Sequence, residues 1–332
     1  MSMNQNRKKY LDIAKGIGII LVVVGHSFPD ESSPGGISIL TFDIIKRIIY
    51  TFHMPLFFFI SGYLAKKIIL QFNFCQVFKK FQRLFIPYIF MSIVYIPLRI
   101  FLSKMATSTY PIKDLWKILI GISPNGGAWF LYVLLLVNII SIIFINKNNI
   151  YFILLLSFIA TFVTRGNLIF ISYSVLRYFC YNYFFFVIGL LCSTKITNFE
   201  EKLDNQKEYL FIILFGVLFL AYYSLNWTFL SAILAIIGVI VVLIISKHIE
   251  NSNFSSTIKG YLCHLGVDSM YIYILHGPIQ VLVRYIFWNK LELNYIVCVS
   301  FMFIFGLIGS LIIEHFIIKK NLLLNWALTG ER

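Results

Sequence analysis

Apolar stretches of about twenty residues recur along the sequence, and no other feature limits the possible folds as strongly. A stretch of that length can cross the hydrocarbon core of a bilayer as an α-helix. Inside lipid, backbone N–H and C=O groups must pair with one another, and an α-helix achieves this within one segment. The alternating pattern of a membrane β-barrel is absent from the sequence. We therefore expect an all-α, polytopic membrane protein.

The composition agrees with this expectation. Of the 332 residues, 59% are hydrophobic and 13% are charged, whereas a soluble domain carries about 25% charged residues. The chain lacks the polar surface to cover its own core, so lipid must cover it. We expect one transmembrane domain over 1–332, without a separate soluble domain, and a polar loop at 195–208. The ten expected spans are 11–28, 48–65, 84–103, 128–146, 150–165, 173–192, 209–225, 227–246, 267–288 and 294–318.

The distribution of basic residues predicts the orientation. The formal net charge is +14. In a soluble protein this charge would suggest nucleic acid, but in a membrane protein basic residues hold loops on the cytoplasmic side. With the N-terminus inside, about 18 Lys and Arg fall in cytoplasmic segments and about 7 in outer ones. We therefore expect a multi-pass protein of the plasma or inner membrane, with both termini in the cytoplasm. We expect no nucleic-acid partner.

The five cysteines show no metal-binding or redox spacing. Cys180, Cys192 and Cys298 lie in apolar runs, where a thiol usually packs as a small apolar side chain. We expect no disulfide framework, no metal site and no bound cofactor.

The first span carries three ionisable residues on one face. At about 100° per residue, Lys15 and His26 lie about 20° apart around the helix axis, and Asp12 lies about 40° from His26. Lys15 and His26 are about 16 Å apart along the axis, so they cannot act on one atom. Ionisable groups within membrane spans are costly and are often functional. The alternatives are a simple Asp12–Lys15 pair at the helix entrance and a His26 that bonds a backbone carbonyl.

Two further histidines lie in predicted spans. His53 begins the second span at a depth similar to His26, with Pro55 in an early helical turn; an interfacial capping role is the alternative. His276 is followed by Gly277 and Pro278, which predicts a broken helix of the kind that lines a cavity. A purely structural role remains open for His276 as well.

Three arginines fall toward the outer ends of their spans, namely Arg99, Arg177 and Arg284. Each can extend its guanidinium to the lipid headgroups. Together they would also make the outer half of a cavity attractive to anions.

The sequence resembles a known family at several of these positions. The matching segments, in order, are Asp12-Ile-Ala-Lys15-Gly16-Ile, Val-Val-Val-Gly25-His26-Ser27, Phe52-His53-Met54-Pro55-Leu56-Phe57-Phe58, Ser61-Gly62-Tyr63, Arg83-Leu-Phe-Ile-Pro87-Tyr88, Trp129-Phe130-Leu131 and Tyr273-Ile-Leu-His276. They are similar to the membrane acyltransferase type three family, which includes bacterial O-acetyltransferases of surface polysaccharides. The first two segments are fairly specific as a pair, and the segments cover nearly the whole chain.

The resemblance implies a function and a set of site residues. Family members have about ten spans and use acetyl-CoA from the cytoplasm. The family places a basic residue ten intervening positions before the histidine, so Lys15 and His26 are the implied catalytic residues. Many members have Arg at the first position, and Lys15 departs from that pattern by losing bidentate hydrogen bonding. We assign Asp12, His53, His276 and Arg177 to support or to acceptor binding.

The expected reaction moves an acyl group, most simply acetyl, from acyl-CoA to a hydroxyl of a surface glycan or lipid-linked sugar. The basic residues of the inner loops would hold the phosphates of the donor; they are Lys66, Lys67, Lys79, Lys80 and Arg83. The pantetheine arm would follow the polar face from Lys15 toward His26. An imidazole can serve as a general base or form an acyl-histidine, and the sequence leaves both open.

Two other classes of function are compatible with these features. A transporter or flippase of a glycan would also need many spans and intramembrane charges, but the two halves of the chain show no matching interrupted spans. A structural partner of a polysaccharide-assembly complex is the third class. The Lys15–His26 pair favours the enzyme, with membrane lipid and polysaccharide-assembly proteins as its expected surroundings.

Overall fold

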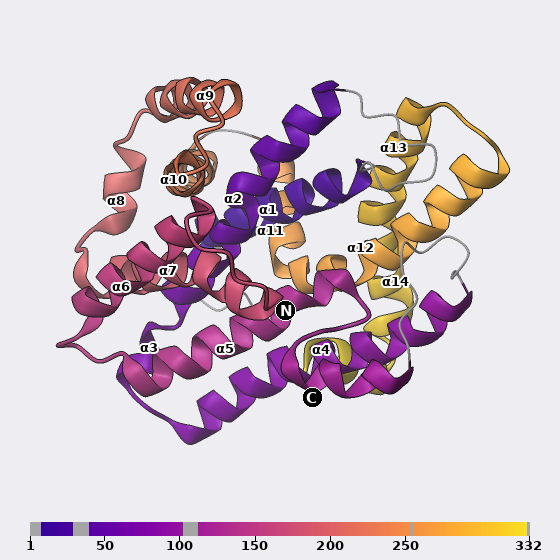
Figure 1. The fold of residues 1–332 in the computed structure, drawn as a ribbon, viewed down its shortest axis with the longest axis horizontal. Helices are drawn as coiled ribbons and strands as arrows, with labels where there is room; N and C mark the ends of the chain where they lie inside the picture. The colour runs from indigo at the N-terminus through magenta and orange to yellow at the C-terminus, as the bar shows by residue number, and fades with distance from the viewer. Residues whose placement is uncertain (1–7, 29–39, 102–111, 253–254, 331–332) are drawn as a thin grey trace.

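The computed structural model describes residues 8–28, 40–101, 112–252 and 255–330, and within these ranges it contains helices and no strands (Figure 1). The helices of the first half are α1 Lys9–Ser27, α2 Leu40–Leu64, α3 Lys66–Leu70, α4 Phe74–Phe101, η1 Ile112–Ile120, η2 Gly126–Ala128, α5 Trp129–Phe144 and α6 Ile150–Arg165. Those of the second half are α7 Ser174–Lys195, α8 Phe199–Asp204, α9 Glu208–Ser224, α10 Leu230–Asn251, α11 Ser256–Val267, α12 Ser269–Arg284, η3 Tyr285–Lys290, α13 Tyr295–Ile304, η4 Phe305–Gly309, α14 Ser310–Ile313, η5 Glu314–Ile318 and α15 Leu322–Thr329.

Within the described residues, each stretch expected to span the membrane overlaps a helix, and the last two residues of 84–103 lie outside them. In the described chain, seven helical segments are long and apolar enough to cross a bilayer, and α6 and α9 are shorter apolar helices of 16 and 17 residues. The all-α, polytopic membrane fold is therefore confirmed. The number of crossings and the side of each terminus stay predictions.

Three local expectations are wrong. Pro55 was expected in an early helical turn, but α2 begins at Leu40 and Pro55 lies well inside it. The segment 195–208 was expected to be a loop, but it contains α8. The helix was expected to break at His276-Gly277-Pro278, but α12 continues through Pro278. The irregular turns of this region are π-helical and come later, in η3, η4 and η5.

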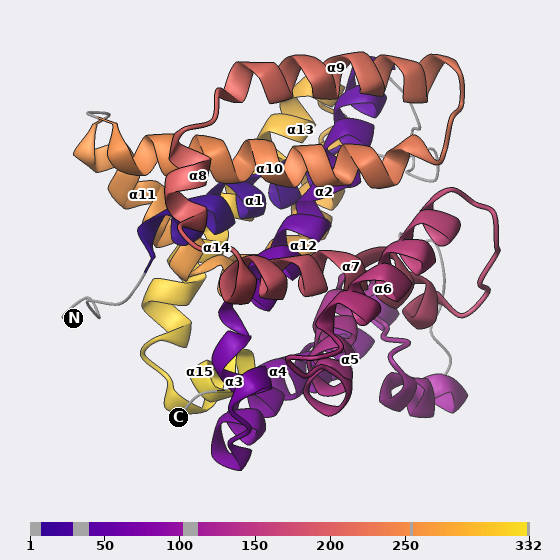
Figure 2. The same cartoon turned by 90° about the vertical axis from the view of Figure 1, so that its left-hand side faces the viewer.

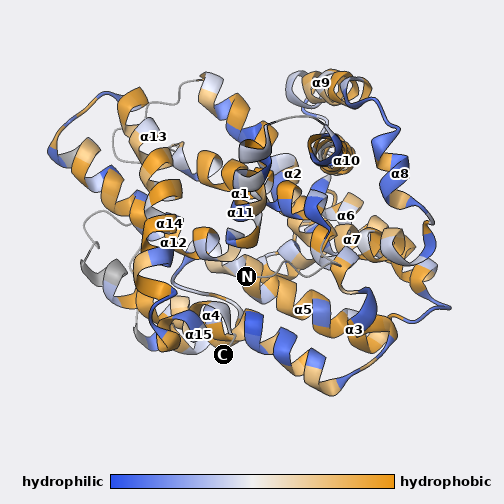
Figure 3. Cartoon of the chain, turned by 180° about the vertical axis from the view of Figure 1, so that it is seen from behind, coloured by the Kyte–Doolittle hydropathy of each residue, from blue (hydrophilic) through white to orange (hydrophobic). Residues whose placement is uncertain are grey.

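The outer surface of the bundle is apolar. On α9, Phe219 is the buried residue, while Leu210, Ile213, Val217 and Leu220 are exposed. Figure 3 shows hydrophobic residues along α9 and α13 and hydrophilic ones on α8. Such a continuous apolar surface is what a lipid-facing helix presents.

Four short helices mark one end of the bundle. Figure 2 shows α8, α11 and α15 in its left-hand part and α3 at the bottom, left of centre, whereas the connection between α9 and α10 lies at the right. The basic residues of the first group are Lys66, Lys67, Lys202 and Lys259, and Lys319 and Lys320 come just before α15. Because α1 starts near this end and α15 finishes there, the described chain enters and leaves the bundle on the same side.

Glycines allow two pairs of helices to touch through their backbones. A Cβ atom at Gly62 of α2 would lie 1.9 Å from the carbonyl oxygen of Phe186 in α7, and one at Gly189 of α7 would lie 2.1 Å from that of Phe59. Small residues permit this close approach in membrane helices. The same kind of contact holds α11 against α1, the helix that carries His26, because a Cβ at Gly16 would lie 2.2 Å from the carbonyl oxygen of Leu262.

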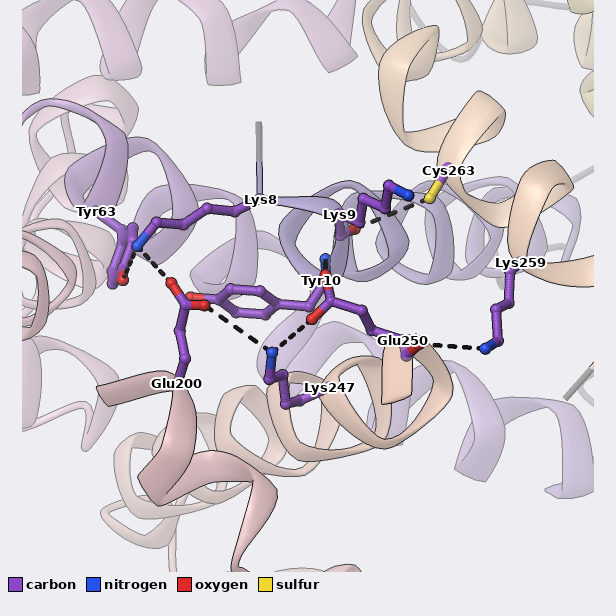
Figure 4. A network of polar contacts seen from close by, with 9 residues as sticks. All are labelled: Lys8, Lys9, Tyr10, Tyr63, Glu200, Lys247, Glu250, Lys259 and Cys263. Atoms are coloured by element: carbon purple, nitrogen blue, oxygen red, sulfur yellow. Dashed lines mark hydrogen bonds and ion pairs between the residues drawn. The ribbon is translucent and has the colours of Figure 1, made fainter. Parts of the chain in front are cut away.

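A polar network at the end that carries α8 fixes the start of α1 (Figure 4). Lys8 pairs with Glu200 of α8 at 2.5 Å and donates to the Tyr63 hydroxyl at 2.8 Å. Partial burial alone would lower the pKa of Lys8, but the bonds to Glu200 and Tyr63 raise it above its usual value. Lys247 pairs with Glu250 at 2.6 Å, and Glu250 accepts from the backbone N–H of residue 10 at 3.2 Å. The network joins α1 to α8 and α10.

Candidate active site

A cavity of about 820 Å³ lies among α1, α2, α6, α7 and α12. His26, Tyr50 and His53 line it, together with Arg165. Aromatic side chains form much of the remaining wall; they include Trp129, Tyr178, Tyr181, Tyr222, Tyr273 and Tyr295. A concave site that combines aromatic surface with a few polar groups is typical of a small-molecule or sugar-sized ligand.

A second cavity of about 220 Å³ shares His26, Gly127 and Tyr273 with the first. It is lined by His276 and Gln280 of α12, by Tyr95 of α4 and by Asn125 before η2. His26 lines both cavities. His26 therefore lies where the two cavities adjoin, together with Gly127 and Tyr273.

The ring of His26 is exposed to the cavities and makes no hydrogen bond within the described chain. Although it sits well inside the molecule, its side chain is exposed, because it faces the cavities. In the described chain, neither of its ring nitrogens has a hydrogen-bond partner. Its ring centroid lies 5.3 Å from that of His276 and 6.0 Å from that of Tyr50. The alternative in which His26 bonds a backbone carbonyl has no support among the described residues.

His53 and His276 are held by the backbone of their own helices. The Nδ1 atom of His53 lies 2.8 Å from the carbonyl oxygen of Ile49, and that of His276 lies 2.9 Å from the carbonyl oxygen of Ile272. A carbonyl oxygen only accepts, so in both rings Nδ1 must carry the proton. In a neutral imidazole, Nε2 then remains a free acceptor. Both histidines are fixed in position and tautomer, in contrast to His26.

Gln280 anchors the end of α1 and was missed by the sequence analysis. Its Nε2 donates to the Val23 carbonyl at 3.0 Å and lies 2.9 Å from the Ser27 Oγ. These contacts fix the helical turn that carries His26. The only signal in the sequence is the spacing, since Gln280 follows His276 by four residues and so lies on the same face of the helix.

Arg165 was also missed, because it was counted only as a loop charge. The ring of Pro55 provides no N–H, so the Thr51 carbonyl one turn earlier lacks its helical donor. Arg165 supplies one: its Nη1 donates to that carbonyl at 3.2 Å, and its Nε donates to the Tyr181 carbonyl at 3.1 Å. These two bonds place the guanidinium in the wall of the larger cavity.

The three outer arginines of the sequence analysis have separate locations. Arg177 lies in the first turn of α7, over the ring of Tyr178 at 5.6 Å, and is not in the lining of either cavity. Arg284 lines the smaller cavity. The side chain of Arg99 lies outside the described residues. Acceptor binding by Arg177 stays a prediction.

Lys15 lies away from His26, as its helical spacing requires, and its Nζ is 3.4 Å from the Oδ1 of the buried Asp12. On the first turns of α4, ahead of the apolar stretch 84–103, Lys79 and Arg83 are exposed and Lys80 is partly buried. Burial, together with the nearby positive charges of Arg83 and Lys15, lowers the pKa of Lys80 to about 8. Lys80, one of the residues expected to bind the donor, thus lies within electrostatic reach of both Lys15 and Arg83.

Known families and proteins match much of the chain. The family model described as an acyltransferase domain matches residues 8–315. The nodulation protein NolL of Mesorhizobium japonicum is 29% identical over 215 residues, which cover 64% of this chain and 54% of that protein. NolL of Sinorhizobium fredii is 30% identical over 219 residues, 64% of this chain and 55% of that protein. The chain thus matches about half the length of these relatives. No solved structure matches.

Proposed function

The chain belongs to the membrane acyltransferase family whose domain covers residues 8–315, and from this premise we propose that it transfers an acetyl group from acetyl-CoA to a hydroxyl of a cell-envelope glycan. The acceptor is a sugar of a surface polysaccharide or of its lipid-linked precursor. The reaction takes place in the plasma or inner membrane, with the donor on the cytoplasmic side.

The observation that carries the proposal is that His26 lines both cavities. Group transfer requires donor and acceptor to reach one reactive group from different directions. The cavity of about 820 Å³ has the size and the aromatic lining for a sugar. The cavity of about 220 Å³ has room for the acyl end of a thioester but not for a glycan.

The ring nitrogens of His26, which have no hydrogen-bond partner in the described chain, can serve in general-base or in covalent catalysis. In the first, His26 removes the proton of the sugar hydroxyl while its oxygen attacks the thioester carbonyl. The carbon–sulfur bond then breaks, and the leaving thiolate takes the proton from the imidazolium. In the second, the imidazole attacks first and an acyl-histidine passes its acyl group to the sugar. Both routes yield an ester and free CoA.

The donor approaches from the end of the bundle that carries α3, α8, α11 and α15. Three observations support this side: the basic residues of that end, the cluster of Lys15 with Lys80 and Arg83, and the shared polar face of Lys15 and His26. The phosphates of CoA bind the cations at the start of α4, and the pantetheine arm extends along α1 toward His26.

The test uses the purified protein in detergent with acetyl-labelled acetyl-CoA and a panel of oligosaccharides. We expect label in the glycan and release of one CoA for each ester formed. In proteoliposomes, movement of a glycan across the bilayer without acetylation would replace this proposal with a transporter.

A further inference from the structure

The larger cavity contains two cations that no carboxylate of the described chain neutralises. Arg165 and Lys46 both line it. The carboxylate in the same lining, Asp43, is already paired with Arg47 at 2.8 Å. Lys46 lies over the ring of Tyr50 at 5.7 Å. The cavity therefore has an excess of positive charge.

The guanidinium of Arg165 has hydrogen-bonding capacity left. Two of its five N–H groups are used on the carbonyls of Thr51 and Tyr181. It stacks near the rings of Tyr181 and Phe185, at 5.6 and 5.4 Å. A cation within a membrane span is costly unless an anion or several acceptors offset it. A purely structural role for Arg165, in which it links helices, explains the two hydrogen bonds. It does not explain the excess positive charge or why the guanidinium lies in a cavity wall.

The position of Arg165 relative to His26 limits the shape of a ligand. Arg165 binds the carbonyl of Thr51, two residues before His53 on α2. The ring of Tyr50 lies 5.0 Å from that of His53 and 6.0 Å from that of His26. An anion on Arg165 and a hydroxyl at His26 are thus separated by the width of a few rings, which suits two groups of one sugar or of neighbouring sugars.

We propose that the acceptor is an anionic glycan whose acid group binds Arg165 and Lys46 while its reacting hydroxyl meets His26. This inference rests on the proposed acyl transfer to a glycan and adds the chemical class of the acceptor. The shared chemistry is an oxyanion, which a guanidinium binds through charge-assisted hydrogen bonds. Its source is either the diphosphate of a lipid-linked sugar or the carboxylate of an acidic sugar.

The experiment compares three acceptors with the same sugar core: a neutral oligosaccharide, its uronic-acid analogue and its polyprenyl-diphosphate form. We expect kcat/KM of the unaltered protein to be at least about tenfold higher for one anionic acceptor than for the neutral one, since one charge-assisted hydrogen bond accounts for that ratio. The acceptor that shows the preference identifies the source of the oxyanion.

Variants assign the preference to residues. Arg165→Gln should raise KM for the preferred anionic acceptor by a larger factor than KM for the neutral one. Lys46→Gln, which breaks no hydrogen bond to the backbone, should reduce the same preference even if Arg165→Gln fails to fold. Lys290→Gln is the matched control, because this exposed cation lies outside the cavity and should change nothing.

Two results would overturn the inference. One is equal kcat/KM for neutral and anionic acceptors in the unaltered protein. The other is a loss in Arg165→Gln that is the same for all three acceptors, combined with an unchanged preference in Lys46→Gln. Absence of transfer to every acceptor would instead count against the proposed function.

Discussion

The three histidines around the cavities differ in how they are held. His53 and His276 each bond a carbonyl one turn earlier in their own helix, so their rings are fixed. His26 has no such bond in the described chain and lines both cavities. A ring that exchanges a proton or an acyl group must have a free nitrogen, and His26 meets this condition.

We expect His26→Ala to lower the acyl-transfer rate by about a hundred- to ten-thousandfold, because loss of a positioned general base has that effect. His26→Asn should not rescue activity, since an amide cannot take a proton near neutral pH. The measurement is turnover of acetyl-CoA in detergent, beside the melting temperature of each variant. An active His26→Ala protein would refute the mechanism, and an inactive but unfolded one would favour a structural role.

His53→Ala and His276→Ala should lower turnover less than His26→Ala. The rate of each variant, measured with both substrates varied, separates weaker binding from slower chemistry. If His276→Ala were as slow as His26→Ala with unchanged KM, the reacting group would be the pair of rings, whose centroids are 5.3 Å apart.

The sequence predicted the catalytic candidate but only part of its surroundings. His26 was found because an ionisable side chain in an apolar span is rare and costly. Arg165 and Gln280 could not be found in this way. Their roles depend on contacts with Thr51 and Val23, which are 114 and 257 residues away in the chain. Spacing along one helix predicts a face, but not the residues that will lie opposite it.

At the scale of helices, the apolar pattern predicted where each span lies better than where each helix begins. Hydropathy detects the lipid-crossing part, whereas α2 and α4 extend beyond it through polar or basic turns. Pro55 was expected in an early turn of its helix, and Pro278 was expected to break its helix. Both are accommodated inside continuous helices, as happens when neighbouring groups satisfy the freed carbonyls.

The contact between α2 and α7 gives a prediction about stability. Gly62→Ala should destabilise the protein by about 1–3 kcal/mol, because its Cβ would overlap the backbone of α7. Gly216→Ala on α9 is the control: nothing lies within 4 Å of its Cβ, and alanine favours a helix by about 1 kcal/mol over glycine. Thermal unfolding in detergent compares them, and equal melting temperatures would contradict the close contact.

The start of α4 gives a prediction about the donor. Reversing the charge of Lys79, Lys80 and Arg83 together should raise KM for acyl-CoA at least about tenfold, because phosphates lose charge-assisted bonds. The acceptor KM should stay the same. Reversal of Lys202 and Lys207, basic residues in and after α8, is the control and should leave both values unchanged. An unaltered donor KM in the triple variant would leave these cations as orientation signals alone.

The donor site also has an expected pH dependence. The pKa of Lys80 is lowered to about 8, so its ammonium is charged below that pH and neutral above it. Affinity for acyl-CoA should therefore fall as the pH rises through about 8, and less steeply in Lys80→Arg, which keeps its charge. Donor binding measured from pH 6.5 to 9.5 (a range of about 3 pH units around this value) tests it.

For the whole molecule, we expect both termini in the cytoplasm. The described chain starts and finishes at the same end of the bundle, and that end holds most of the basic connections. A reporter fused after Arg332 should be active only on the cytoplasmic side. An extracytoplasmic signal would refute the topology, and the helix at 150–165, with 16 residues, would be the first to re-examine.

Because one imidazole lines both cavities, the selectivity of the reaction depends on what fills the larger one. If the larger cavity holds no sugar, it has room for a water molecule at the position of the attacking hydroxyl, and His26 can deprotonate either nucleophile. The rate at which water hydrolyses the thioester then depends on how fully the glycan fills the larger cavity. A tight-fitting acceptor would thus protect the thioester simply by excluding solvent.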